Sequence, residues 1–415
     1  MDRRDFLMGT GTALATGAGA LAGAGLFAGG AAASEPVADD PAAASGSASG
    51  RALASLRAAV GEVEAGFSDP AWRISDPADL VDARRLLLHT LQHGLEVFVE
   101  GDARRPVFKR FVTPEKKLLG DNPDAIYFHS LVDPAGRYRI RGNIAGATYT
   151  SFTVELGTAD GGNSTGVGAA LNDTGFDVAP DGSYEIIASA QGGGRNHLAL
   201  PEGAGSLSTR HYYERERSVA ADRLHHVPIV IEPLDPLPPP PRPSDERLAA
   251  GVRRVERFVR TSVRPMGSGE QPRWVSRIPN QLPTPQRKGN DNAATGFAAV
   301  DNVYSMAPFL LAPDEALVIR GRYPKCRFAN VVLWNRFLQT LDYAHRRTSL
   351  NRKQTRLEAD GSFKIVVAGS DPGVPNWLDN EGRRFGMIFW RFLLPEQDIE
   401  PLRTEVVTLA AAAKA

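Results

Sequence analysis

The feature that most constrains the fold of this 415-residue chain is an internal repeat. Three short motifs recur in the same order at offsets of 179, 179 and 180 residues: 139–142 with 318–321, 181–186 with 360–365, and 196–198 with 376–378. A period this long is far beyond the repeats of solenoid proteins, so it favours two copies of one domain. The alternative is that similar turn chemistry alone makes the segments alike.

Short runs rich in β-branched and aromatic residues fill the first copy, and turns containing Pro and Gly separate them. They predict strands at 126–132, 138–141, 149–156 and 184–189. Helical periodicity is confined to 51–67, to a segment from Asp76-Pro77 to Gly101, and to about 245–263. The second helix carries an apolar stripe, predicted to face the core: Leu80, Ala83, Leu87, Leu91, Leu95 and Phe98. The two copies are therefore predicted to be mainly β, with accessory helices.

Composition divides the chain into six segments, and a proline-dense run ending at 238–241 marks the main boundary. The predicted segments are an export signal (1–33), a flexible tether (34–50), a helical region (51–120), a first β copy (121–236), a Pro-rich linker with a helix (237–296) and a second β copy (297–405). A cleft where the two copies meet is the natural place for a site.

The N-terminus has the pattern of a targeting signal. Arg3-Arg4 precede Phe6-Leu7, a weakly apolar stretch rich in Ala, Gly and Thr follows, and small residues at 31–33 offer a cleavage site. The pattern predicts export by the twin-arginine route to the periplasm, the cell envelope or the exterior, with no stable membrane span after cleavage. An uncleaved membrane anchor is the alternative.

Composition also limits the chemistry. The 48 Lys and Arg residues balance the 48 Asp and Glu residues, which disfavours a nucleic-acid partner. Cys326 is the only cysteine, so an intramolecular disulfide and a multi-cysteine zinc site are excluded, and a buried, inert thiol is expected. His89 and His93 stand four residues apart without an evident third ligand, which favours packing over a metal site. The sequence lacks a phosphate loop, a nucleophile elbow and a dinucleotide fingerprint, so no cofactor is predicted.

Distinctive motifs cluster in the second copy and upstream in the first. The set resembles the bacterial family called domain of unknown function 1214, over about 121–236 and 297–400: Ala299–Tyr304, Pro313–Leu317, Gly321–Pro324, Leu333–Asn335, Ser370–Asp379 and Phe389–Phe392, with Asp121–Asp124, Tyr127 and Arg137–Gly142 upstream. The resemblance implies two tandem β-sandwich or jelly-roll-like domains, often in exported or envelope proteins. The family has no agreed reaction, so the resemblance assigns no catalytic residue.

The first candidate site surrounds the start of a predicted strand. Asn122 and Asp124 flank Pro123, and Tyr127 and His129 would share one face of the strand that follows. Asp124, Tyr127 and His129 would then supply an acid, a donor and a base. Alternatively, Asp124 caps a turn and Tyr127 packs at a sheet edge.

The second candidate is a loop made rigid by prolines. Asp371 opens it, and Trp377 stands between Asn376 and Asp379. An aromatic ring with polar neighbours can hold a sugar, with the ring covering the apolar face and the polar groups binding hydroxyls. The alternative is that Trp377 packs within its own sandwich.

The third candidate is a basic segment in the second copy. Arg346, Arg347 and Arg352 lie in a stretch where Asp342 is the only acid between Arg336 and Arg356. Arginines suit a phosphate, a carboxylate or an acidic glycan. A solvated surface is the alternative.

Together these candidates favour an envelope-associated protein that recognises a carbohydrate or another anionic small molecule or polymer. The first alternative is a glycosidase-like hydrolase whose carboxylate pair, Asp124 and Asp371, would need to lie roughly 5–10 Å apart across a cleft, with His129 as a base. A structural envelope protein without a small ligand is the second alternative.

Overall fold

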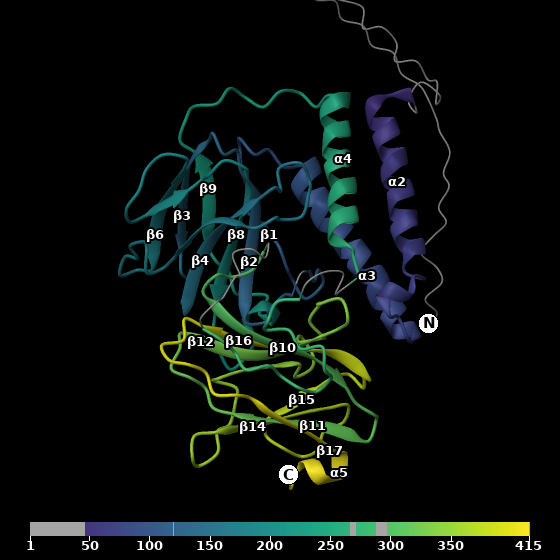
Figure 1. Ribbon diagram of the computed structural model, residues 1–415. Helices are drawn as coiled ribbons and strands as arrows, with labels where there is room; N and C mark the ends of the chain where they lie inside the picture. The colour runs from purple at the N-terminus through teal and green to yellow at the C-terminus, as the bar shows by residue number, and fades with distance from the viewer. Residues whose placement is uncertain (1–45, 119, 266–270, 288–296, 415) are drawn as a thin grey trace, which may run out of the picture. The chain divides into compact units, whose positions relative to one another are not determined.

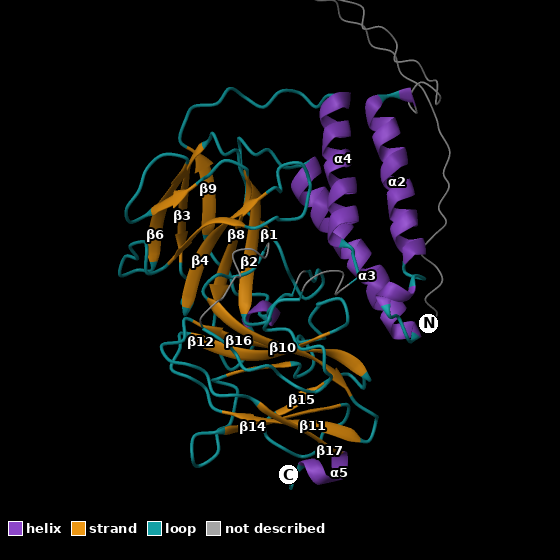
Figure 2. Ribbon diagram, viewed as in Figure 1, coloured by secondary structure: helices purple, strands orange, loops and turns teal. Residues whose placement is uncertain are grey.

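Two β-sandwiches of the same topology form most of the chain (Figures 1 and 2). The computed structural model describes residues 46–118, 120–265, 271–287 and 297–414. The predicted export signal, 1–33, and the predicted tether up to residue 45 lie outside the described residues.

The first sandwich pairs a five-stranded sheet with a four-stranded one. The first sheet has the order β1-β2-β8-β4-β5 and the second β7-β6-β3-β9. The strands are β1 (Lys109–Arg110), β2 (Ala125–Leu131), β3 (Arg137–Asn143), β4 (Tyr149–Leu156), β5 (Val167–Asn172), β6 (Ser183–Ser189), β7 (His197–Ala199), β8 (Ala204–Tyr212) and β9 (Ile229–Pro233).

The second sandwich repeats this arrangement with two four-stranded sheets. Their orders are β10-β16-β12-β13 and β15-β14-β11-β17. The strands are β10 (Asn302–Leu310), β11 (Glu315–Gly321), β12 (Phe328–Trp334), β13 (Ser349–Asn351), β14 (Phe363–Ala368), β15 (Trp377–Asp379), β16 (Phe385–Leu393) and β17 (Arg403–Thr408). A short helix, α5 (Leu409–Ala412), follows β17.

The repeat appears in the details of pairing as well as in strand order. In both sandwiches the strand after the Asp-Gly-Ser turn pairs in parallel with the next short strand: β6 with β7, and β14 with β15. Gly182 and Gly361 hold φ values of 85° and 82° in these turns, and Asp181 and Asp360 accept hydrogen bonds from the following serines. The prediction of a mainly β fold with two tandem sandwich domains related by an internal repeat is confirmed.

Each sandwich has its own apolar core between its sheets. Alternate residues along the strands point inward, as β geometry requires. The first core centres on Ile140, Phe152, Ile186 and Leu207. The second centres on equivalent strands and contains Trp390, stacked at 5.2 Å from Phe363.

The helices gather into a layer of their own. It comprises α2 (Ala48–Gly66), α3 (Pro77–Gly94) with the π-helical turn η2 (Leu95–Val99), and α4 (Asp245–Ser262), which packs against both α2 and α3 although it lies between the two copies in the sequence. The 3-10 turns η1 (Pro70–Trp72) and η3 (Val219–Ala221) complete the helical elements.

Helix starts follow from capping. The Asp76 side chain caps α3 by accepting the N–H of Asp79, as predicted. Helix α2 begins at Ala48, ahead of the predicted residue 51, because Ser47 caps it by accepting the N–H of Gly50 and because the Asp245 carboxylate of α4 accepts the N–H groups of Ala48 and Ser49. Such long-range capping is invisible to a local pattern.

The predicted apolar stripe of the second helix is correct except at one position. Ala83, Leu87 and Phe98 are buried, but Leu95 is 41% exposed. The reason is that α3 buries a face containing Ala83, Leu86, Thr90 and Gly94, and Leu95 follows Gly94 by one residue, about 100° round the helix, which takes its side chain off that face. No helix within 46–118, 120–265, 271–287 or 297–414 is both long and apolar enough to cross a membrane.

Alanine substitutions at two glycines, one in a turn and one in a helix, should change the free energy of unfolding in opposite directions. Gly361→Ala should lower the free energy of unfolding by about 1 kcal/mol, because a side chain disfavours positive φ. Gly61→Ala, inside α2 with no atom within 4 Å of an added Cβ, should raise the free energy of unfolding by about 0.5–1 kcal/mol. Urea unfolding followed by circular dichroism measures both, and an unchanged midpoint for Gly361→Ala would contradict the assigned turn.

Candidate functional site

A pocket of about 860 Å³ opens where the helical layer and both sandwiches meet. Its wall is drawn from five segments of the chain: α3 (Asp82, Arg85, His89), the segments 114–117 and 217–224, and the segments 335–345 and 381–383 of the second copy. We call it the junction pocket. Its volume falls within the range of small-molecule sites.

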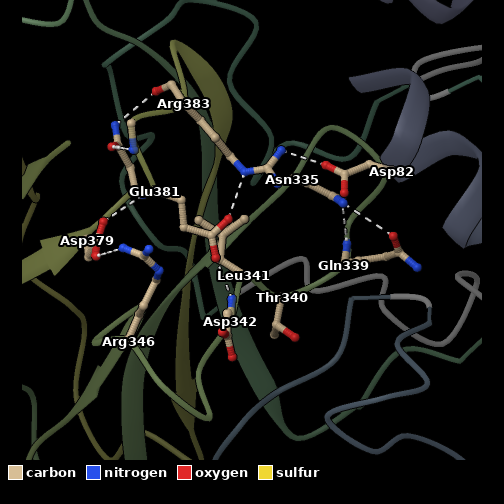
Figure 3. Close-up of polar contacts among 12 residues, drawn as sticks. Asp82, Asn335, Gln339, Thr340, Leu341, Asp342, Arg346, Asp379, Glu381 and Arg383 are labelled. Atoms are coloured by element: carbon tan, nitrogen blue, oxygen red, sulfur yellow. Dashed lines mark hydrogen bonds and ion pairs between the residues drawn. The ribbon is translucent and has the colours of Figure 1, made fainter. Parts of the chain in front are cut away.

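One side of the junction pocket is a chain of ion pairs (Figure 3). Arg383 donates to Asp82 on α3 at 2.6 Å and to Glu381 at 3.0 Å. Glu381 also accepts the backbone N–H of Asp342 at 2.7 Å. The contacts join α3 to the second copy and hold these carboxylates as ion-pair partners on the pocket wall.

His89 lines the same pocket, together with the cations Arg85 and Lys117. Its Nδ1 lies 3.2 Å from the backbone N of Lys117 and 3.1 Å from Nε2 of Gln339. Both partners are donors, so Nδ1 accepts and the neutral ring carries its proton on Nε2. Burial first, and then the positive charge of Arg85, lowers the pKa of His89 to about 4. The ring is therefore neutral at pH 7, in a positive local potential.

Lys117 supplies a second cation. Its buried Nζ donates to the carbonyl oxygens of Thr340 and Leu341 at 2.8 and 2.7 Å and lies 4.8 Å from the ring centre of Tyr343. Burial lowers the pKa of Lys117. Within the described part of the chain, no carboxylate oxygen lies within 4.0 Å of this ammonium group.

The first candidate site is dispersed. Asp124 is 0% exposed and joins the two copies: its carboxylate accepts Nδ2 of Asn330 at 2.9 Å and Nδ2 of Asn351 at 3.1 Å. Asn122 accepts from the same Asn330 at 2.7 Å. Asp124 therefore acts in a buried contact between the copies, not in a cleft.

His129 lies elsewhere, apart from the Asp124 cluster. It shares a face of β2 with Tyr127, as predicted, but its Nδ1 lies 3.2 Å from Nε2 of His93, beside the ring of Phe111. Burial lowers the pKa of His129 to about 4. His93 is likewise a packed side chain, as the packing interpretation predicts, whereas His89 lines the junction pocket.

The predicted pair of carboxylates is not formed. Asp371 stands in an exposed turn, where it accepts the N–H of Gly373. Asp124 has no exposed area, so the two acids cannot line one solvent-filled cleft. The reason is that Pro123 leads Asp124 into the contact between the sandwiches, whereas the prolines near Asp371 close an outer turn.

The rigid loop of the second candidate site is held by its own polar groups. Asn376 is buried and donates to the carbonyl oxygens of Arg356 and Lys364. Trp377 donates Nε1–H to the carbonyl of Ala368 at 3.0 Å and packs in an apolar cluster with residues of β11, β14 and α5. The Asn376 amide is thus committed to the fold, and Trp377 covers the outer face of its sheet.

The three arginines of the basic segment do not form one cluster. Arg352 makes a two-pronged ion pair with Glu214 of the first copy, at 2.7 and 2.8 Å. Arg346 pairs with Asp379 at 2.8 Å, and Arg347 donates to the carbonyl of Pro375. Asp379 is therefore an ion-pair partner of Arg346 and not an open sugar-binding carboxylate.

Sequence reasoning missed most of the junction pocket, including Arg85, Lys117, Gln339 and Arg383. These residues belong to segments far apart in the chain, and no local pattern links them. The one available signal was His89, noted only for its spacing to His93. Among the described residues, no group of three or more His, Cys, Asp or Glu side chains is placed to hold a metal ion. Burial raises the pKa of Cys326 to about 11, which keeps it a thiol.

Comparison with one solved structure supports the fold. No family model matches the chain, and no curated protein matches it. The crystal structure of an uncharacterized protein from Burkholderia cenocepacia is 29% identical, with a TM-score of 0.74 over 88% of this chain and 98% of that one. The VPA0106 protein from Vibrio parahaemolyticus is 14% identical, with a TM-score of 0.45 over 79% and 98% of the two chains.

The buried Asp124 generates a pH prediction. Burial raises its pKa from 3.8 to about 6, against the effect of its amide donors. A carboxyl whose folded pKa is raised binds its proton more tightly when folded, so its contribution to stability is lost as pH rises through about 4 to 6. This loss should be about 3 kcal/mol, and Asp124→Asn should abolish it.

Urea unfolding at several pH values between about 4 and 7 tests this expectation. The exposed Asp371→Asn variant is the matched control and should keep the wild-type pH dependence. Equal pH dependence in the wild type and Asp124→Asn would contradict the assignment.

Proposed function

We propose that this protein is an exported, envelope-associated recognition protein whose junction pocket binds an anionic carbohydrate. The observation that carries the proposal is the pocket wall formed by the cations Arg85 and Lys117 and the neutral ring of His89. The twin-arginine pattern at Arg3-Arg4 and the resemblance to domain of unknown function 1214 support export and an envelope role, and they are part of the same proposal.

The charges of the pocket favour an anion at one end. The carboxylates of Asp82 and Glu381 are paired with Arg383, and Glu115 is paired with Arg223 at 3.2 Å. Of the two other acids that line the pocket, Asp342 lies 3.0 Å from Nδ1 of His345 and Asp222 accepts the N–H of Leu224 at 3.1 Å. Arg85, by contrast, has only a loose contact of 3.8 Å with Asp82 and is about half exposed. Its guanidinium can therefore turn to a ligand carboxylate without breaking a close ion pair.

The neighbouring histidine complements that arginine. Because Nδ1 of His89 accepts hydrogen bonds from the protein, Nε2–H remains as the donor on the pocket side. A neutral donor beside a guanidinium suits an acidic sugar, which offers hydroxyl and carboxylate oxygens together. Gln339 fixes the ring orientation, since its amide also donates to the carbonyl of Lys117 at 2.8 Å.

Recognition is favoured over hydrolysis by the way in which the acids are held. A glycosidase needs two carboxyl groups facing one another across the bound sugar. The predicted acids Asp124 and Asp371 do not meet, and the paired carboxylates of the junction pocket hold α3 to the second copy. The pocket therefore has the groups to bind an acidic sugar, with its acids engaged in structural contacts.

The adjacent arginines of α3 provide a matched test. Arg85 lines the pocket, whereas Arg84 pairs with Glu64 on the helix surface at 3.0 Å. Arg85→Gln should weaken binding of a galacturonate trimer about ten-fold or more, and Arg84→Gln should leave it unchanged. Calorimetric titration measures both, and added salt should weaken the wild-type affinity, because the pocket is partly solvated.

A neutral galactose trimer is the ligand control. Equal binding of the neutral and acidic trimers, or equal loss in the two arginine variants, would overturn the proposal. Release of new reducing ends from polygalacturonate would show a hydrolase instead.

A further inference from the structure

A second, smaller cavity lies between the two sandwiches and is distinct from the junction pocket. It has a volume of about 50 Å³, and both copies contribute to its wall. Four of its polar residues form two matching pairs: Tyr127 with Arg210 from the first copy, and Tyr304 with Arg391 from the second. We call it the paired-arginine cavity.

The two pairs are equivalent through the internal repeat. Tyr127 on β2 lies opposite Arg210 on β8, and Tyr304 on β10 lies opposite Arg391 on β16. Strands β2 and β10 are counterparts in the two sandwiches, as are β8 and β16. Duplication has therefore brought two buried arginines to one place.

The first arginine is balanced within its own copy. Arg210, 5% exposed, donates to Ser208 and Thr153 at 3.3 and 2.8 Å. The Ser208 hydroxyl in turn donates to the buried carboxylate of Glu155 at 2.7 Å. Glu155 thus provides a negative charge one hydroxyl away from Arg210.

The second arginine has no carboxylate at the position equivalent to Glu155. In the sheet register, Trp334 takes the place of Glu155 and Phe389 takes the place of Ser208. Arg391 lies over both rings, 5.2 Å from the centre of Trp334 and 4.5 Å from that of Phe389. The rings offer a weak attraction to a cation, but no hydrogen-bond acceptor and no full charge.

Arg391 is accordingly underpaired. It is 3% exposed, and its Nη2 donates to the carbonyl of Gly120 at 2.6 Å. Its Nη1 is buried and has no hydrogen-bond partner among the described residues, which also place no carboxylate oxygen within 4.0 Å. The buried Asp121 carboxylate interacts with Arg391 electrostatically from beyond 4.0 Å, but it gives Nη1 no hydrogen bond. An unsatisfied buried donor of a guanidinium is unfavourable, which favours an anion within hydrogen-bond distance of Nη1.

A second donor faces the same space. Tyr127 lines the cavity, and none of the described residues gives its hydroxyl a hydrogen bond. Tyr304 differs, because its hydroxyl contacts the backbone of Ala299. Burial and the neighbouring Tyr212 raise the pKa of Tyr127 well above its usual value, so the hydroxyl keeps its proton and can donate.

The rest of the wall sets the size and polarity of the ligand. Phe111, Leu118 and Phe297 make much of it apolar, which strengthens charge-assisted hydrogen bonds. Asp121 also lines it, but its carboxylate accepts the N–H and the hydroxyl of Thr340, which lines the junction pocket on the other side. The two cavities are thus separated by this contact.

We propose that the paired-arginine cavity binds a small carboxylate anion through Arg391 and the hydroxyl of Tyr127. A carboxylate offers two oxygens in one plane, which matches the planar donors of a guanidinium, and its second oxygen can accept from a tyrosine. The size of the cavity restricts the group to a few heavy atoms, on the scale of acetate. The site is independent of the carbohydrate proposed for the junction pocket.

Acetate titration of the full chain tests the site. Sodium acetate should raise the thermal unfolding temperature of the wild type above that in sodium chloride at equal ionic strength, and neutral acetamide should not. Arg391→Gln should abolish the acetate response, with a loss of affinity of about ten- to a hundred-fold by calorimetry. Without acetate, this variant should unfold no earlier than the wild type, because it removes an underpaired buried charge.

Two further variants make the test decisive. Arg327→Gln removes another arginine between the copies, one already paired with Asp173 at 2.8 Å, and should keep the full acetate response. Tyr127→Phe removes only a hydroxyl and should weaken acetate binding about five- to ten-fold, even if Arg391→Gln fails to fold. Equal shifts by acetate and chloride would overturn the carboxylate assignment. No acetate shift, or unchanged affinity in Tyr127→Phe, would overturn the site.

Discussion

The contact of Asp124 with Asn330 and Asn351 is the interaction on which both cavities depend. Apolar surfaces can slide over one another, but a buried carboxylate must keep its donors, so the contact fixes one orientation of the two copies. Apolar residues of both copies, including Tyr212 and Leu393, pack around the same seam. The loop that leads into Asp124 carries Lys117 and Asp121, which line the junction pocket and the paired-arginine cavity respectively. Because Asp124 is held in the contact between the copies, the loop before it is positioned to line both cavities.

The two sandwiches have the same topology, but the loops at equivalent positions differ in sequence and in what they contact. In the first copy, the loop after β4 turns toward the helices, where Asp160 pairs with Arg257 of α4 at 2.9 Å. In the second copy, the loop after β12 carries Asn335 and Gln339 to the junction pocket. The loop after β4 therefore contacts the helical layer, whereas the equivalent loop after β12 lines the junction pocket.

The sequence predicted those parts of the fold that depend on local or repeated chemistry. The Asp-Gly-Ser turns, the cap of α3 and the alternation of β2 all follow from nearest neighbours and recur in the structure. The predicted sites, by contrast, rested on sequence patterns that occur both in binding sites and in purely structural contacts. Prolines around Trp377 indicate a rigid loop, but rigidity serves a folded edge as well as a binding surface. The charge of Arg352 is neutralised by Glu214, which lies 138 residues earlier, and only the tertiary fold shows that pair.

The same limit explains why the paired arginines escape a search for repeated motifs. Loops of different length move Tyr304 and Arg391 out of the common offset, so the equivalence appears only when the strands are placed in register. Register also shows how the copies differ: both have the arginine, but the second has the rings of Trp334 and Phe389 where the first has Glu155 and Ser208. A buried guanidinium whose Nη1 donor has no partner among the described residues opposes folding, so packing alone does not account for Arg391. Retention of the charge beside a free hydroxyl donor is better explained by an anion that binds there.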